Sequence, residues 1–203
     1  IIAQLWALLL MSISMWLKRD LQMHDAKDII EKIWELDKKL EWLFEKQNHY
    51  KKLADKYSKF SNFFYLGRNI VYGTACECSL KLKELSYIHA ESYSTWELKH
   101  GPLALVSPSF PCIVINPKGV MREKTISNIK EIKARDWTVL WVITAWDNEK
   151  DIYDDIIEIP KTHPILTPFL PLIPLWIFAV EVAKNLNRDI DKPQNLAKSV
   201  TVE

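Results

Sequence analysis

Lysine and glutamate side chains in the stretch Ser79-Leu-Lys-Leu-Lys-Glu-Leu-Ser-Tyr87 have the types and spacing for acid–base chemistry. On a helix, Lys81 and Glu84 lie three residues apart on one face, whereas Lys83 points elsewhere. A carboxylate beside an ammonium group can move protons, but most such pairs are surface salt bridges that contribute little to stability. Residue type and spacing alone leave both interpretations open.

His100 is a second candidate, in the segment Glu97-Leu-Lys-His-Gly-Pro-Leu103. Gly101 and Pro102 are expected to end a short helix there and to leave the imidazole at a turn. Histidine titrates near neutrality and suits general acid–base catalysis, although a lone histidine is more often structural or simply exposed. No HxH or HExxH spacing occurs among the five histidines, so the sequence predicts no metal site.

Two further candidates are the terminal lysine and one predicted strand end. Partial burial of Lys198, in NLAKSVTVE (195–203), could lower its pKa and allow a Schiff base to form, but chain ends are usually frayed and inert. The junction Tyr65–Asn69 follows a predicted strand and precedes a predicted helix, where open α/β sheets bind ligands. Its single glycine is too few for a phosphate loop.

Short apolar runs alternate with helical stretches from residue 62 onward, which predicts an α/β fold with a largely parallel sheet. The predicted strands are apolar throughout, as expected when helices cover both faces, and span 63–67, 111–117, 138–144 and 155–160. Predicted helices span 69–87, 121–135 and 165–187, and the tail from residue 188 is polar without a period.

The first 57 residues are predicted to be helical. Residues 1–17 are apolar but short for a membrane span, and they lack the positive start of a signal peptide, so we expect a buried helix. Between Asp25 and Tyr57, apolar residues three and four apart predict an amphipathic helical connector with a solvated charged face.

Composition limits the class of partner. The chain has 203 residues, 48% of them hydrophobic, which is enough for one sizeable core. Its 27 Lys and Arg against 26 Asp and Glu give a net charge of +1, without a broad field for nucleic acid or anionic membrane. Three cysteines without CxxC spacing favour a reducing, cytoplasmic compartment. The chain has four glycines, fewer than is usual for its length, and nine tryptophans, more than is usual.

Four stretches together resemble the isomerase half of the glucosamine-6-phosphate synthase family (glutamine:fructose-6-phosphate aminotransferases). They are FFYLGRN (63–69), SLKLKELSYIHAESYSTWELKHGPLAL (79–105), SNIKEIKARD (127–136) and DKPQNLAKSVTVE (191–203). The resemblance implies a sugar-isomerase (SIS) three-layer α/β sandwich, its mostly parallel sheet flanked by helices and preceded by connector helices. It divides the chain into the last helix of a truncated first SIS subdomain (1–20), a connector (21–61) and a second SIS subdomain with an active-site tail (62–203).

The resemblance also implies an activity: conversion of fructose 6-phosphate and glutamine-derived ammonia to glucosamine 6-phosphate through an open-chain imine, with no metal or organic cofactor. Lys198 would form the imine, and Glu84 would move a proton between C1 and C2. His100 would open the sugar ring in the site of a neighbouring subunit, so a homodimer is expected. Lys81 and Ala197 would contact the sugar-phosphate substrate.

The sequence departs from the family in several places. It contains neither a glutaminase domain nor the phosphate-binding loops of a first subdomain, so we expect the isolated chain to be inactive in glutamine-dependent synthesis. Asn69, Trp96, Trp137 and Trp146 stand where the family has glycine or another small or polar residue, and an indole at a turn that needs positive φ is strained. Trp96 is also close enough to His100 in sequence to block it.

Two alternatives stay open. One is a glutaminase-free SIS enzyme, either a glucosamine-6-phosphate deaminase or a sugar-phosphate isomerase. The other is a non-catalytic SIS module that binds a sugar phosphate. Without an upstream subdomain, residues 1–17 should present an exposed apolar face.

Overall fold

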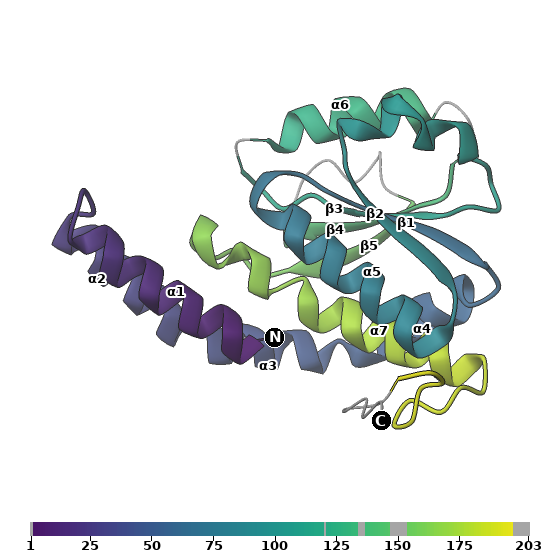
Figure 1. The fold of residues 1–203 in the computed structure, drawn as a ribbon, viewed down its shortest axis with the longest axis horizontal. Helices are drawn as coiled ribbons and strands as arrows, with labels where there is room; N and C mark the ends of the chain where they lie inside the picture. Colours follow the sequence, from purple (N-terminus) through teal and green to yellow (C-terminus); the bar gives the residue numbers. More distant parts are fainter. Residues whose placement is uncertain (1, 120, 134–136, 147–153, 197–203) are drawn as a thin grey trace, which may run out of the picture.

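A five-stranded parallel sheet forms the centre of the fold in the computed structural model, which describes residues 2–119, 121–133, 137–146 and 154–196 (Figure 1). The strand order is β2-β1-β3-β4-β5, and each neighbouring pair is parallel. The strands are β1 (Asn62–Gly67), β2 (His89–Ser94), β3 (Cys112–Ile115), β4 (Val139–Thr144) and β5 (Asp155–Ile159). The predicted parallel α/β architecture is therefore confirmed.

Helices cover both faces of this sheet, which makes the three layers visible in Figure 1. One face carries α4 (Gln47–Tyr57), α5 (Tyr72–Ser86) and α7 (Leu172–Asn185), and the other carries α6 (Arg122–Lys133). Along β1, Phe63 and Tyr65 join the core under α4, α5 and α7, whereas Phe64 and Leu66 join the core under α6. Because successive residues face opposite layers, a strand buried on both sides is apolar at every position.

Strand β2 was not predicted. Its residues HAESYS lie at the edge of the sheet, pair with β1 alone and are mostly half-buried. An edge strand with one side near solvent has no need of a continuous apolar run, and β2, unlike the edge strand β5 with its three isoleucines, has none.

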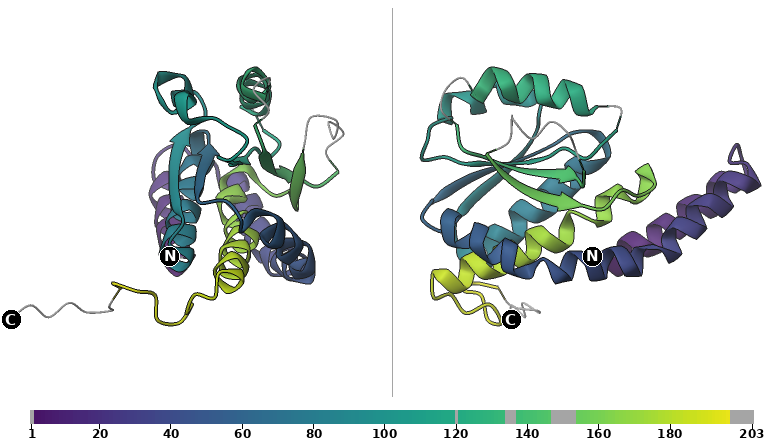
Figure 2. Two further views of the ribbon diagram at one scale, coloured as in Figure 1. Left: turned by 90° about the vertical axis from the view of Figure 1, so that its right-hand side faces the viewer. Right: turned by 180° about the vertical axis from the view of Figure 1, so that it is seen from behind.

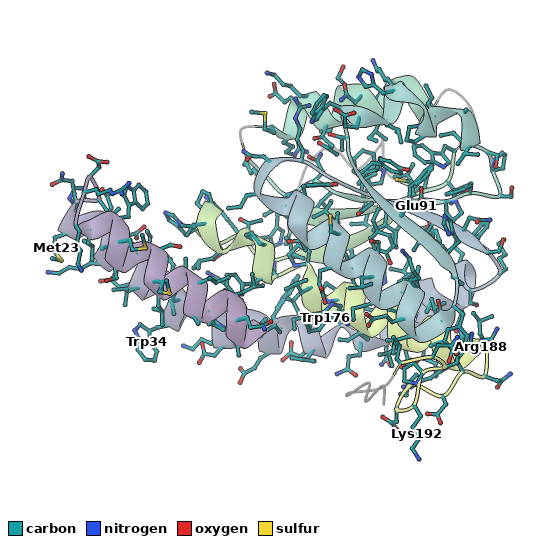
Figure 3. The ribbon with its side chains drawn as sticks, viewed as in Figure 1. Met23, Trp34, Glu91, Trp176, Arg188 and Lys192 are labelled. Carbon is teal, nitrogen blue, oxygen red and sulfur yellow. The ribbon has the colours of Figure 1, made fainter. Side chains whose placement is uncertain are left out.

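Three helices precede the sheet: α1 (Ile2–Leu17), α2 (Met23–Trp34) and α3 (Leu36–Glu45). Figure 2 shows α1 and α2 projecting from the α/β body as an arm. In α1, Leu9 and Ile13 alone are buried, so the expected exposed apolar face is present and the expected buried helix is buried on one side only. Met23, labelled in Figure 3 at the far end of the arm, is 62% exposed, and Trp34, labelled at the other end of α2, is 77% exposed.

Two predicted helices are interrupted. The connector predicted for residues 25–57 is three helices, with breaks at Glu35 and Lys46. The helix predicted for residues 165–187 is a 3-10 helix, Pro164–Phe169, followed by α7. Pro168 and Pro171 lack the N–H that would continue a single helix, which explains the second break.

The stretch Pro164–Asn185 is long and apolar enough to cross a membrane by composition alone. Its most apolar part is 61% buried within the protein, and α7 packs against both α4 and α5. Core helices of globular proteins share this composition. We therefore interpret α7 as the central helix of its layer.

Candidate active site

Helix α5 carries a half-buried cluster of charged side chains. The Lys81 Nζ lies 2.5 Å from a carboxylate oxygen of Glu84 and 3.9 Å from one of Glu77. Side-chain exposures of 30%, 27% and 13% for Lys81, Glu84 and Glu77 put the cluster at the margin of the core. The predicted Lys81–Glu84 pair is thus formed, and Glu77 is a third member that the sequence interpretation missed.

Glu77 has an environment unlike that of Glu84. Burial raises the pKa of the Glu77 carboxyl above its ordinary 4.5, the nearby Lys81 opposes that rise, and the negative charge of Glu84 adds to it. Among the described residues, its buried Oε1 atom has no hydrogen-bond partner. One ammonium group therefore faces two carboxyl groups, one of which has a raised pKa, an arrangement suited to moving a proton.

The C-terminal tail approaches the same end of α5. Tyr87, three residues after Glu84, caps the helix in a left-handed conformation with φ of 63°. Its hydroxyl accepts a hydrogen bond from the backbone N–H of Gln194, at 2.7 Å. The guanidinium of Arg188 lies 5.0 Å from the centre of the Tyr87 ring (Figure 3). The described tail is therefore held beside the end of the helix that carries Glu84.

Ala197 and Lys198 lie outside the described residues, so their predicted roles are not tested by the structure. Lys198 is four residues beyond Gln194, a separation that an extended chain spans in at most about 14 Å. This reach includes the end of α5.

His100 and Glu84 lie near opposite ends of the parallel strands. Helix α5 runs back to the end of the sheet where the strands begin. Strand β2 then runs along the edge of the sheet, parallel to β1, and leads to the 3-10 helix Glu97–His100 at the other end (Figure 1). The six residues of β2 span about 20 Å. Gly101, at φ of 147°, ends the short helix as predicted. Within one chain the structure does not bring His100 and Glu84 together.

The tryptophans at glycine-like positions differ in their surroundings. The Trp96 φ of −82° is ordinary, so the expected strain is absent there. Its ring stands nearly perpendicular to the His100 ring, with the centroids 6.3 Å apart, and the expected blockage stays a prediction. Trp146, with φ of 61° and 81% exposure, is strained as expected. Asn69 also has a positive φ, of 55°.

Trp137 is buried instead. Its ring packs edge-on against Phe64, with the centroids 6.3 Å apart, and its indole N–H donates to the Phe110 carbonyl oxygen. A buried indole with a satisfied N–H stabilises the core under α6.

The structure also bears on metal and thiol chemistry. In the part of the chain that is described, no three His, Cys, Asp or Glu residues are grouped to hold a metal ion. Cys76, Cys78 and Cys112 are free thiols. Burial raises the pKa of the Cys78 and Cys112 thiols, which makes both poor nucleophiles.

The junction Tyr65–Asn69 lies at the end of β1. Arg68 and Asn69 line a cavity there, together with residues that follow β3. The junction therefore borders a cavity at the strand end, and its proposed ligand binding stays a prediction.

Comparison with known proteins gives a consistent pattern. Residues 56–183 match the SIS domain family. The glutamine–fructose-6-phosphate aminotransferase [isomerizing] of Thermus thermophilus is 42% identical over 184 residues, which are 90% of this chain and 30% of that protein. The chain thus spans about a third of the length of the curated relatives that it matches.

Solved structures agree. The C-terminal domain of glucosamine-fructose-6-phosphate aminotransferase from Francisella tularensis matches with a TM-score of 0.82 and 30% identity, covering 87% of this chain and 50% of that one. Glucosamine-6-phosphate deaminase from Thermotoga maritima matches with a TM-score of 0.57 and 26% identity, covering 79% of this chain and 48% of that one.

Proposed function

Because this chain belongs to the SIS domain family, we propose that it is the isomerase part of a glucosamine-6-phosphate synthase. The proposed reaction converts fructose 6-phosphate and ammonia from glutamine to glucosamine 6-phosphate. The observation that carries the proposal is the Lys81 cluster at the end of α5 with the tail held beside it, in a chain 42% identical to a named aminotransferase. We assign residues 1–20 to a first SIS subdomain, 21–61 to a connector and 62–203 to the second.

The chemistry follows from an amine, a carboxylate and an open-chain ketose. The Lys198 amine attacks C2, the carbonyl oxygen leaves as water, and ammonia then replaces the lysine at C2. The C2 iminium acidifies the C1 hydrogen, so the Glu84 carboxylate removes a proton from C1 and returns it to C2. The O1 hydroxyl releases its proton as C1 becomes the aldehyde. Lys81 and Ala197 contact the sugar phosphate.

His100 belongs to a second site in this proposal. The strand length that separates it from Glu84 argues against both acting on one sugar within one chain. In a homodimer, His100 of one subunit would open the sugar ring bound beside Glu84 of the other. The free thiols and the small net charge favour a cytoplasmic protein without nucleic-acid or membrane partners.

The two alternatives are less well supported. The deaminase structure matches with a TM-score of 0.57, against 0.82 for the aminotransferase domain. A module that only binds sugar phosphate has no use for an imine-forming lysine or for a carboxylate cluster beside it. We therefore retain the synthase as the single proposal.

A chimera provides the test. The 203 residues would replace the corresponding last third of the Thermus thermophilus relative, and the purified chimera would be treated with fructose 6-phosphate and borohydride before intact-mass measurement. We expect product formation and one reduced sugar-phosphate adduct, both lost in Lys198→Ala and kept in the control Lys192→Ala. An adduct that persists in Lys198→Ala would contradict the imine assignment, and a folded chimera without product would contradict the function.

A further inference from the structure

Helix α5 ends on a residue that is rarely found in such a position. Tyr87 has φ of 63° and ψ of 14°, in the left-handed region, and its N–H donates to the carbonyl of Lys83 at 3.1 Å. Glycine is the usual residue at this point of a helix end, because a Cβ atom is strained there. Backbone strain of this kind persists where a side chain has a role that glycine could not fill.

The residues on either side fix the backbone of Tyr87. Ser86 and Ile88 are 1% and 6% exposed. The Ser86 hydroxyl donates to the carbonyl of Leu82 at 2.5 Å and accepts a hydrogen bond from the Ile88 N–H at 3.3 Å. The Tyr87 backbone is therefore held between two buried residues, whereas its side chain is half-buried and reaches the C-terminal tail.

Two contacts join the Tyr87 side chain to the tail. Its hydroxyl accepts a hydrogen bond from the backbone N–H of Gln194 at 2.7 Å. Because the donor is a backbone group, this contact does not depend on which side chain occupies position 194. The guanidinium of Arg188 lies 5.0 Å from the centre of the ring, a distance that suits a cation–π interaction (Figure 3). The tail therefore meets Tyr87 at two separate points.

The tail between these two points is shaped by its own hydrogen bonds. The Arg188 N–H donates to the carbonyl of Ala183 at 2.9 Å, which closes the end of α7. The Asp189 carboxylate then accepts hydrogen bonds from the N–H groups of Asp191 and Lys192, at 3.0 and 3.1 Å. An aspartate that bonds the backbone two residues on stabilises a turn. The tail thus leaves α7 along a defined path and turns back to the end of α5.

The same end of α5 carries the candidate base. Glu84 lies three residues before Tyr87, which is a helical rise of about 4.5 Å. Lys198 follows Gln194 by four residues. The contact between Tyr87 and the tail therefore limits how far the terminal amine can lie from the Glu84 carboxylate.

We propose that Tyr87 is a positioning residue, which holds the tail at Gln194 and so places the Lys198 amine beside Glu84. The inference rests on the proposed function, because it requires a lysine that forms the imine. It goes beyond that function by assigning a role to a residue that need not touch the sugar. The Tyr87 hydroxyl raises the fraction of time that the amine is within reach, so it acts on the rate of imine formation and not on the affinity for the sugar.

The test uses the chimera and two measurements. Hydrogen exchange, followed by mass spectrometry, reports on the peptide that contains Gln194 whether or not the enzyme is active. Borohydride trapping at saturating fructose 6-phosphate reports on the rate of imine formation. Tyr87→Phe should speed the exchange and slow the trapping by roughly threefold to tenfold, as expected for one lost hydrogen bond, with KM for fructose 6-phosphate within about twofold. Tyr50→Phe removes a buried hydroxyl without a partner among the described residues, and it should change neither rate.

A third variant separates positioning from a structural role. Glycine adopts φ of 63° without strain, so Tyr87→Gly should have a Tm at or above that of Tyr87→Phe, yet it loses both tail contacts and should show the slowest trapping. Unchanged trapping in Tyr87→Gly, or unchanged exchange in Tyr87→Phe, would overturn the positioning role and leave the synthase proposal intact. No adduct in the unmodified chimera would overturn both.

Discussion

The two ends of the parallel strands carry different charged groups, with carboxylates near the end where the strands begin and cationic residues near the end where they finish. Near the beginning, α5 presents two carboxylates that share Lys81, with the tail alongside. Near the end, Arg68, Lys118 and Arg122 line a cavity without an acid, and His100 is exposed on the loop after β2. Because α5 runs opposite to the strands, it places the Lys81 cluster and His100 at opposite ends of the strands within one chain. Under the proposed function, a complete sugar site would take these groups from more than one subunit.

The largest effect is expected at the side where the strands begin. In the chimera, Glu84→Gln keeps the shape of the side chain but removes the base, so kcat should fall by roughly 10²–10⁴-fold. Steady-state formation of glucosamine 6-phosphate measures it. Glu45→Gln, which changes an exposed carboxylate on α3, is the matched control and should leave kcat unchanged. If Glu84→Gln retained its activity, the assignment of the catalytic base to Glu84 would be wrong.

Mixing two inactive variants tests whether one active site combines Glu84 of one subunit with His100 of the other. His100→Asn alone should lower kcat by roughly 10²-fold through loss of the ring-opening acid–base group. If each site takes His100 from one subunit and Glu84 from the other, co-refolded Glu84→Gln and His100→Asn chimeras should recover about a quarter of full activity. No recovery in a mixture shown by native mass spectrometry to contain mixed dimers would mean that both residues act within one subunit.

A smaller effect should follow from Glu77. Its native pKa is raised, so the folded state holds the proton more tightly than the unfolded chain, and stability falls as pH rises from about 4.5 through the native pKa. Glu77→Gln removes this loss. The difference in Tm between Glu77→Gln and the unmodified chain should therefore grow in favour of the variant between pH 4 and 7, as measured by calorimetry. The difference should stay constant for Glu45→Gln, and a constant difference for Glu77→Gln would refute the burial effect.

The smallest effect concerns Trp146, two residues after β4 on the side where the strands end. Glycine takes φ of 61° without strain, so Trp146→Gly should stabilise the fold by on the order of 1 kcal/mol. Trp146→Ala keeps a Cβ and should not recover that gain. Urea unfolding of both variants separates relief of backbone strain from loss of the exposed ring, and equal stabilities would exclude strain.

Much of the fold could be predicted because β1, β3 and β4 are buried on both faces. Residues 138–144, for example, form a nearly continuous apolar run because helices cover both faces of this strand, and such a run is visible in the sequence itself. Strands β2 and β5 lie at the two edges, and β5 was still predictable because it keeps three isoleucines in DIIEI, whereas β2 reads HAESYS. The helix break at Glu35 could not be predicted because no Gly or Pro lies there. In the structure, Glu35 forms ion pairs with Lys32 and Lys39, which lower the pKa of its carboxyl to about 2.

The candidate site was predictable only in part. Lys81 and Glu84 meet because helical spacing alone brings them together, and the same spacing of four and seven residues could have identified Glu77. The contact between Tyr87 and Gln194 joins positions 107 residues apart, so no local pattern contains it. The distance between His100 and Glu84 likewise depends on β2, the strand that the pattern did not reveal.

The pairing of α4 with α7 has a consequence for how the chain folds. Asn185 donates a hydrogen bond to Asp55 across 130 residues, and both helices cover the same face of the sheet. During synthesis, that face stays open until α7 leaves the ribosome, after the strands have already been made. Closure of such long loops makes folding slow, and the uncovered strands are prone to aggregate meanwhile. Chaperone dependence should therefore be greatest for chains that end before residue 172.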